Sequence, residues 1–169
     1  MGTMRAARGT IHPDDLYRLP GHLIRRCHQI AVALFLEETA GFELTPQQYA
    51  TLAVLAANDG VDQITLAGLA AFNRTTAGEV IGRMEAAGLV TRTDSTTDRR
   101  VKNIHITRAG RRLLADVQRA IDRVQERLLV PLTAGERKQF VEFLARIASE
   151  NNELSRAPLR RPAGRTAGD

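Results

Sequence analysis

The sequence predicts a mainly α-helical fold that carries one short β-hairpin. Apolar residues make up 43% of the 169 residues, enough for a core, whereas aromatic residues make up 4% and Trp is absent. The core must therefore rest on Leu, Ile, Val and Ala, which recur at the spacing of one helix face along most of the chain. Two segments, 89–92 and 101–106, instead have the composition of strands and flank a polar turn.

The first part of the chain predicts two helices behind a loosely ordered, flexible arm at residues 1–18. Pro20 and Gly21 begin a long helix within residues 19–40, which carries an apolar stripe on one side. Residues 45–48, Thr-Pro-Gln-Gln, match a capping box with Pro at the first helical position. They predict the start of a second helix.

Residues 45–107 predict a winged helix-turn-helix. We expect Thr65 to cap a short helix over residues 66–72, and Asn73 to provide the turn and cap the next helix. Two short helices joined by a tight turn are a helix-turn-helix candidate. The β-hairpin that follows directly, with its charged turn at residues 94–100, has the place of a two-stranded wing.

Residues 108–155 predict two further helices that need a partner surface. Thr107 caps the first, whose apolar residues are spaced three and four apart as in a coiled coil. A second capping box at residues 133–136 begins the last helix. Because these helices and the one at 19–40 carry apolar faces, we expect them to be the dimerisation helices of a homodimer. The tail at residues 156–169, which contains Pro, Gly and Arg, is expected to be disordered.

Positive charge is concentrated in one part of the chain. The whole chain has a net charge of +5, from 24 basic and 19 acidic residues. Residues 74–112 contain nine basic and four acidic residues, so this segment alone carries a charge of +5. A local excess of Arg favours a polyanionic partner, because the guanidinium group suits phosphate and guanine edges. A solvated basic surface is the alternative.

The sequence disfavours several protein classes. Cys27 is the single cysteine, so an intrachain disulfide framework and a multi-cysteine metal site are excluded. The longest apolar run, residues 30–36, is too short to span a bilayer, and no secretory leader is evident, so we expect a cytoplasmic protein. Phosphate-binding loops and catalytic motifs are absent, and the four histidines are scattered. We therefore expect neither an enzyme nor a cofactor nor a metal site.

Five motifs, in order, resemble the MarR (multiple antibiotic resistance regulator) family across residues 20–150. They are residues 44–49 (LTPQQY), 66–70 (LAGLA), 84–90 (MEAAGLV), 98–100 (DRR) and 106–107 (IT). The last two resemble the Asp-x-Arg and Leu-Thr signature of the family's wing, with Ile106 standing at the Leu position.

The resemblance implies a repressor that binds a palindromic operator in double-stranded DNA as an obligate dimer. The second helix of the helix-turn-helix would enter the major groove, and the wing would reach the flanking minor groove. Side-chain chemistry then makes seven residues candidates for DNA contact: Arg74, Thr75, Thr76, Arg83, Arg99, Arg100 and Lys102. Asp98 would orient a wing arginine, and Glu79 would either accept from cytosine or face solvent. For each arginine the alternative is an ordinary surface salt bridge.

The resemblance also implies a small-molecule effector, and the first helix suggests its chemistry. The sequence resembles the branch of the family that governs aromatic-acid breakdown, with benzoate- or nicotinate-like acids as effectors. His22 and Arg26 are four positions apart on one helix face, where they can bind a carboxylate, and Tyr49 can close the site. The alternative is that Arg26 and its neighbouring arginine pair with acids such as Glu37 or Glu38.

Two other functions remain open from the sequence. Cys27, flanked by arginines and His28, has surroundings that favour a reactive thiolate able to sense peroxide, although its place on the apolar stripe favours a buried, inert thiol. A helical dimer that does not bind DNA is the other alternative. DNA binding that weakens steeply as salt rises distinguishes a DNA-binding regulator from such a dimer.

Overall fold

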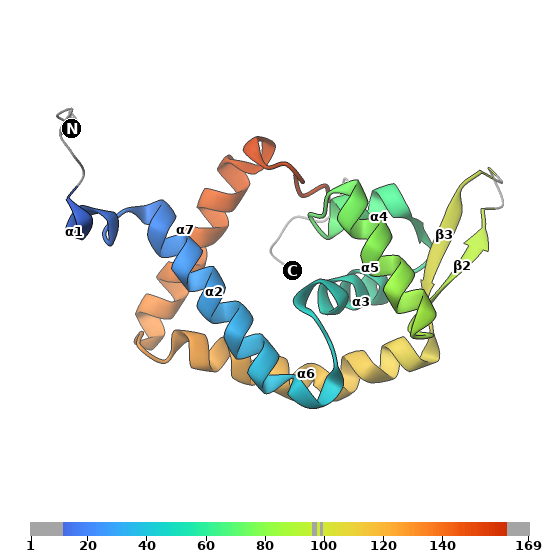
Figure 1. Cartoon of the computed structure of the whole chain (residues 1–169), viewed down its shortest axis with the longest axis horizontal. Helices are drawn as coiled ribbons and strands as arrows, with labels where there is room; N and C mark the ends of the chain where they lie inside the picture. The colour runs from blue at the N-terminus through green and yellow to red at the C-terminus, as the bar shows by residue number, and fades with distance from the viewer. Residues whose placement is uncertain (1–11, 96–97, 99, 162–169) are drawn as a thin grey trace.

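The computed structural model describes residues 12–95, 98 and 100–161, and Figure 1 shows how their elements are arranged. The elements, in chain order, are α1 (Pro13–Leu16), α2 (Pro20–Glu38), η1 (Ala40–Phe42), α3 (Pro46–Ala57), β1 (Val61–Asp62), α4 (Gln63–Leu69), α5 (Arg74–Ala86), β2 (Val90–Asp94), β3 (Lys102–Ile106), α6 (Arg108–Leu129), α7 (Ala134–Glu150) and η2 (Asn152–Leu154). The predicted fold class, a mainly helical winged helix-turn-helix flanked by N- and C-terminal helices, is confirmed.

The helix-turn-helix and the wing share one apolar core. Helices α3, α4 and α5 adjoin a sheet of order β1-β3-β2, in which both pairs of neighbours are antiparallel. Leu52, Leu66, Ile81, Met84 and Ile104 are at most 1% exposed, so four elements each contribute a side chain to this core. Burying each of these side chains stabilises the fold by about 1.5–3 kcal/mol. The sequence predicts the hairpin but misses β1, whose two residues are too few to show a strand periodicity.

Local capping explains where most of these helices begin. Both predicted capping boxes, at Thr45 and Thr133, are present with their reciprocal hydrogen bonds, and Asn73 caps α5 as expected. The prediction that Thr65 caps the short helix is wrong. Asp62 caps α4, because its Oδ1 accepts from the backbone N–H groups of Ile64 at 2.8 Å and Thr65 at 3.1 Å. Helix α4 therefore begins at Gln63 and ends at Leu69, three residues earlier than expected.

The long helix α6 joins the helix-turn-helix and the wing to the outer helices. Its apolar face is buried against α2 and α3, with Val117 and Ala120 at most 2% exposed. Two arginines of α6 also form hydrogen bonds to the last residue of α2. Arg123 Nε donates to Glu38 Oε2 at 2.6 Å, and Arg127 Nη1 donates to Glu38 Oε1 at 2.7 Å. These hydrogen bonds, from Arg123 first and Arg127 second, lower the pKa of Glu38. The carboxylate therefore stays ionised, and α2 is fixed on α6.

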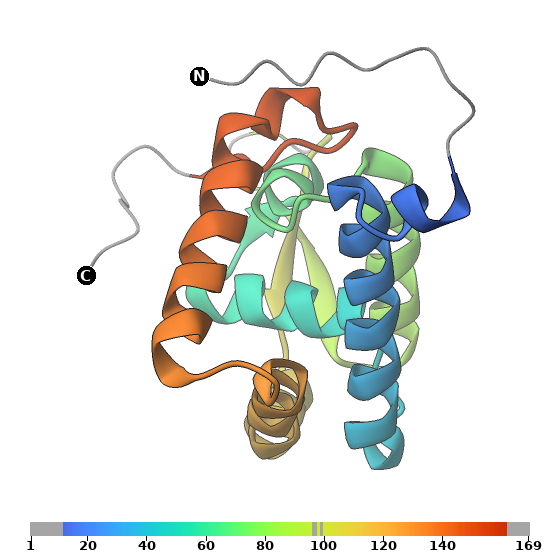
Figure 2. The same cartoon turned by 90° about the vertical axis from the view of Figure 1, so that its left-hand side faces the viewer.

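Helices α2 and α7 leave large apolar side chains uncovered. They cross in the view of Figure 1, but Figure 2 shows them on opposite sides, with α6 below. Every residue of α7 from Val141 onward is exposed, including Phe143 and Ile147, and α2 exposes Leu23 and Ile30. Amphipathic helices with this much uncovered apolar surface are typical of an oligomer interface. No helix in the described part of the chain is long and apolar enough to cross a membrane.

Both ends of the described chain are ordered where the sequence predicts a flexible arm and a disordered tail. Residues 13–16 form the short helix α1 within the expected flexible arm, while residues 1–11 lie outside the described residues. The expected disordered tail is folded over residues 156–161, because Leu159 and Arg160 make backbone hydrogen bonds to Asn152 and Gly68. Residues 162–169 lie outside the described part.

Candidate nucleic-acid interface

Helix α5 presents its first turn at the surface of the helix-turn-helix. One face is buried through Ala77, Val80, Ile81 and Met84, so the opposite face is free. Arg74 and Thr75 are exposed, and the backbone N–H of Thr76 donates to the Asn73 cap at 2.8 Å. The cap thus uses one of the free N–H groups of the first turn. The first-turn candidates Arg74 and Thr75 therefore stand where a DNA groove could receive them.

Further along α5, Arg83 and Glu79 form a pair. Arg83 Nη2 lies 4.0 Å from Glu79 Oε2, and both side chains are mostly exposed. An exposed i,i+4 pair of this length contributes little to stability. This is the surface salt bridge that the sequence left as an alternative for Arg83, and it partly neutralises the charge of Glu79 on a face expected to meet DNA.

Gln63 holds the start of α5 against α4. Its Nε2 donates to the backbone carbonyl of Arg74 at 3.4 Å. The same amide lies 3.2 Å from the position that a Cβ on Gly78 would occupy, so the glycine leaves room for it. Sequence reasoning missed Gln63, because the contact joins residues eleven positions apart and no local pattern signals it.

The wing is shaped by hydrogen bonds at its tip. Asp98 Oδ1 accepts from the backbone N–H of Arg100 at 2.9 Å, and the Asp98 carbonyl accepts from Val101 N–H at 2.9 Å. The described contact of Asp98 with a wing arginine is therefore with the backbone of Arg100. Lys102, which was predicted to contact DNA, pairs with Asp94 across the hairpin. Arg99 lies outside the described residues.

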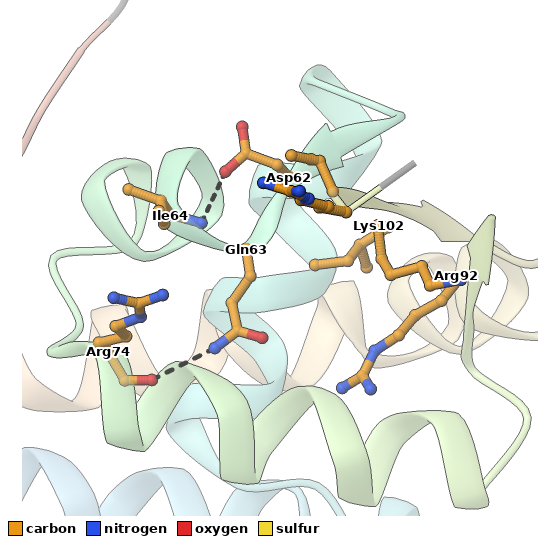
Figure 3. A pocket seen from close by; sticks show the side chains of 9 residues that line it. Asp62, Gln63, Ile64, Arg74, Arg92 and Lys102 are labelled. Atoms are coloured by element: carbon orange, nitrogen blue, oxygen red, sulfur yellow. Dashed lines mark hydrogen bonds between the residues drawn. The ribbon is translucent and has the colours of Figure 1, made fainter. Parts of the chain in front are cut away.

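A basic cleft lies between the helix-turn-helix and the wing (Figure 3), with a volume of about 290 Å³. Its lining includes one acidic side chain, Asp62. Partial burial on its own would raise the pKa of Asp62, but the hydrogen bonds that it accepts from Thr65 and Ile64 together lower it. The carboxylate is therefore ionised, and it serves as a helix cap. The full lining of this basic cleft is Asp62, Gln63, Ile64, Arg74, Arg92, Arg100, Val101, Lys102 and Ile104. Four cationic side chains therefore surround one hollow.

Three of these four cations, Arg74, Arg100 and Lys102, are among the predicted DNA contacts, but Arg92 was missed. Arg92 is paired with Ile104 in the sheet register. It lies two residues after the buried Val90 in β2, so Arg92 and Val90 point to the same face of the strand. Its side chain emerges beside α5, where its Nη1 lies 3.5 Å from Glu85 Oε2. The alternation of side chains along the strand could have placed Arg92 on the face that contacts α5.

The three residues predicted to bind an effector are not brought together within one chain. Tyr49 packs against Phe35, with 6.2 Å between ring centroids. Phe35 lies thirteen positions after His22 on the same helix, about 20 Å at the rise of an α-helix. Burial, followed by the charge of Asp122, raises the pKa of Tyr49, which keeps its hydroxyl protonated.

His22 and Arg26 do share the N-terminal half of α2. The His22 ring is half-buried beneath Tyr17, at 5.8 Å between centroids, and its Nε2 is buried without a hydrogen-bond partner among the described residues. Arg26 is exposed and makes no ion pair within that same part of the chain. Glu37 and Glu38, the acids considered as partners for Arg26, are engaged by Arg127 of α6 instead.

Cys27 is a free, exposed thiol on α2, so it is not the buried side chain that its apolar stripe suggested. That stripe is itself uncovered in the single chain, since Leu23 and Ile30 are also exposed. Within residues 12–95, 98 and 100–161, no group of three or more His, Cys, Asp or Glu side chains could hold a metal ion.

Comparison with known proteins finds a matching family model and relatives of similar sequence. A family model described as MarR family matches residues 42–101. The transcriptional regulator HosA of Escherichia coli O157:H7 is 32% identical over 125 residues, which are 71% of this chain and 92% of HosA. A putative transcriptional regulatory protein for the hcr operon of Thauera aromatica is 32% identical over 159 residues, 89% of this chain and 96% of that protein.

Solved structures agree with the sequence relatives. A structure of the repressor CouR bound to a 23-mer DNA duplex aligns with a TM-score of 0.76 at 30% identity, covering 83% of this chain and 99% of CouR. CouR is a protein of Rhodococcus jostii RHA1. BpsR of Bordetella bronchiseptica, whose DNA binding is regulated by 6-hydroxynicotinic acid, aligns with a TM-score of 0.71 at 26% identity, covering 76% of this chain and 97% of BpsR. From this agreement in sequence, length and fold, the chain belongs to the MarR family of transcriptional regulators.

Proposed function

We propose that this protein is a repressor that binds a palindromic operator as a homodimer and leaves it when a small aromatic carboxylate binds. The observation that carries the DNA-binding part is the basic cleft beside the first turn of α5. Arg74 belongs to both, so one basic surface continues from α5 to the wing. A polyanion is the partner that this chemistry fits.

The residues around the cleft divide into two roles. Arg74 and Thr75, at the exposed start of α5, are the residues proposed to meet base edges in the major groove. Arg92 and Lys102 are proposed to contact the phosphates that pass between α5 and the wing, since phosphate contacts position a protein on the duplex. Arg100 is proposed to enter the minor groove. CouR, of similar fold, has been solved on a DNA duplex, which supports this arrangement.

A homodimer is proposed because α2 and α7 expose apolar side chains that no described part of the chain covers. Leu23, Ile30, Phe143 and Ile147 are each 43–51% exposed. Covering such side chains with a second copy would remove apolar surface from water, which stabilises association. Two copies would also present two basic clefts to the two half-sites of a palindrome.

The proposed effector is a small aromatic acid whose carboxylate binds His22 and Arg26. A buried ring nitrogen without a hydrogen-bond partner costs free energy, and a carboxylate oxygen would supply that partner. Arg26, four positions along α2, has no competing ion pair within the described residues and can add a second charge-assisted bond. The regulation of BpsR by 6-hydroxynicotinic acid supports this class of ligand. Tyr49 stays outside this site in the single chain.

DNA binding by the intact protein tests the first part of the proposal. We expect the purified chain to bind DNA from upstream of its own gene more tightly than random DNA, with an affinity that falls steeply as salt rises. Equal affinity for all sequences, or a monomer at micromolar concentration, would contradict the proposal. Titration of the complex with benzoate, hydroxybenzoate and hydroxynicotinate tests the second part, and no release by any aromatic acid would remove it.

A further inference from the structure

The chain turns back on itself after α7. Residues 155–161, here named the strap and coloured dark red in Figure 1, follow η2 and return to α4 in the helix-turn-helix. Its residues Ala157, Pro158 and Leu159 are half-buried. The strap thus connects the end of α7, a helix proposed to lie in the dimer interface, to the unit proposed to bind DNA.

Hydrogen bonds at two neighbouring residues, Leu159 and Arg160, hold the strap. The side chain of Asn152 pairs with both backbone groups of Leu159: Leu159 N–H donates to Asn152 Oδ1 at 2.8 Å, and Asn152 Nδ2 donates to the Leu159 carbonyl at 3.2 Å. The backbone N–H of Arg160 then donates to the carbonyl of Gly68 at 2.8 Å. This carbonyl lies in the last turn of α4, where it also accepts from the backbone N–H of Ala71 at 3.3 Å, so the strap adds a second hydrogen bond to it. Arg160 also forms a two-bond ion pair with Glu153.

Gly68 allows this close approach. A Cβ added at Gly68 would lie 2.9 Å from Arg160 Cβ and 3.3 Å from Arg160 Cγ. The Cβ of Arg160 moves only with its backbone, so any larger residue at position 68 would force the strap away from α4. Gly68 lies within a helix, where glycine is otherwise unfavourable. Its small size therefore serves the contact with the strap.

We propose that the strap positions the helix-turn-helix relative to α7 and so sets the separation of the two recognition helices in the dimer, with Asn152 as its positioning residue. The inference rests on the proposed function. Without the strap, the connection between α7 and the DNA-binding unit runs through α6 and the turn at residues 130–133. A second attachment, at Gly68, restricts how the helix-turn-helix can move relative to α7, which a single connection would leave less restricted.

The proposal predicts a specific change in DNA recognition. A dimer whose two recognition helices sample several separations binds an operator only from the fraction that matches it, so the apparent Kd rises as that fraction falls. The phosphates contacted in the matching arrangement stay the same, so the salt dependence is unchanged. The tolerance for altered spacing between half-sites increases, because other separations are now populated.

The experiment uses Gly68→Ala, which leaves every charge of the protein unchanged. We expect a five- to tenfold weaker affinity for an operator of natural spacing, and a smaller penalty for one or two base pairs inserted between its half-sites. In a chain that ends after Leu154, and so lacks the strap, Gly68→Ala should change operator affinity less than twofold. Gly135→Ala, a helical glycine with nothing within 4 Å, is the control for helix propensity and should bind as the unaltered protein does.

Two outcomes would overturn the inference. Natural affinity and natural spacing dependence in Gly68→Ala would overturn it, and so would a loss that persists undiminished in the chain that ends after Leu154. If Gly68→Ala lowers the melting temperature, Asn152→Leu replaces it, since this change removes both bonds to Leu159 without altering α4, and the same broadened spacing dependence is expected. If the unaltered protein itself binds no operator, the proposed function fails, whatever the strap does.

Discussion

Arg92 offers a direct test of the phosphate contacts proposed for the basic cleft. The change Arg92→Ala removes one cation from the cleft and leaves the cap of α5, the core and the wing tip in place. It also frees Glu85, whose carboxylate lies 3.5 Å from the Arg92 guanidinium. Because the two side chains are 34% and 40% exposed, losing their ion pair should change stability by less than about 1 kcal/mol.

The expected effect on DNA binding follows from counterion release. Each phosphate neutralised on B-DNA contributes about −0.9 to the slope of log K against log salt concentration. A dimer would lose one Arg92 contact in each half-site, so the slope should become less steep by about 1.8. At about 0.15 M salt this corresponds to about fivefold per contact and about thirtyfold for the dimer, near 2 kcal/mol.

Fluorescence anisotropy with labelled operator, measured between about 50 and 200 mM salt, reads both quantities. Arg119→Ala in α6 is the matched control, because Arg119 is exposed and does not line the cleft; the change removes the same charge and should leave the slope unchanged. The double change Arg92→Ala with Glu85→Ala separates the lost contact from repulsion by the freed carboxylate. An unchanged slope in Arg92→Ala, or an equal change in Arg119→Ala, would refute the assignment of Arg92 to a phosphate.

Three further predictions concern stability and the effector. Gly110→Ala should lower the free energy of unfolding by about 2–3 kcal/mol in a denaturant titration, because its Cβ would lie 2.3 Å from the Leu89 carbonyl oxygen, whereas Gly135→Ala should not destabilise. Since the pKa of Glu38 is lowered in the folded state, its contribution to stability is present above about pH 4.5 and lost as the pH falls through the folded-state value. The melting temperatures of Glu38→Gln and the unaltered protein should therefore differ at pH 7, and the difference should shrink as the pH falls below about 4.5; a difference that stays constant down to acidic pH would contradict this. His22→Ala should keep operator affinity but lose release by aromatic acids, as seen in gel shifts with increasing acid.

Which parts of the interface were predictable depends on how far apart in the chain the cooperating residues lie. Arg74 and Thr75 could be placed from their position behind the Asn73 cap, and Arg100 from its place in a charged turn between strands. Arg92 and Gln63 belong to the same cleft but join it through contacts across different elements. The cap of α4 shows the same limit at short range, because Asp62 and Thr65 are both good caps and only backbone geometry selects Asp62.

The sequence by itself determined the order of the main helices and of the wing hairpin, the helix starts at Thr45, Asn73 and Thr133, and the location of the positive charge. These features depend on residues within a turn or two of each other. Only the tertiary structure decided that four cations surround one cleft, that His22 and Tyr49 lie far apart, and that the tail folds onto α4. These features arise from packing between distant segments, where one hydrogen bond or one missing Cβ, as at Gly68, determines which surfaces meet.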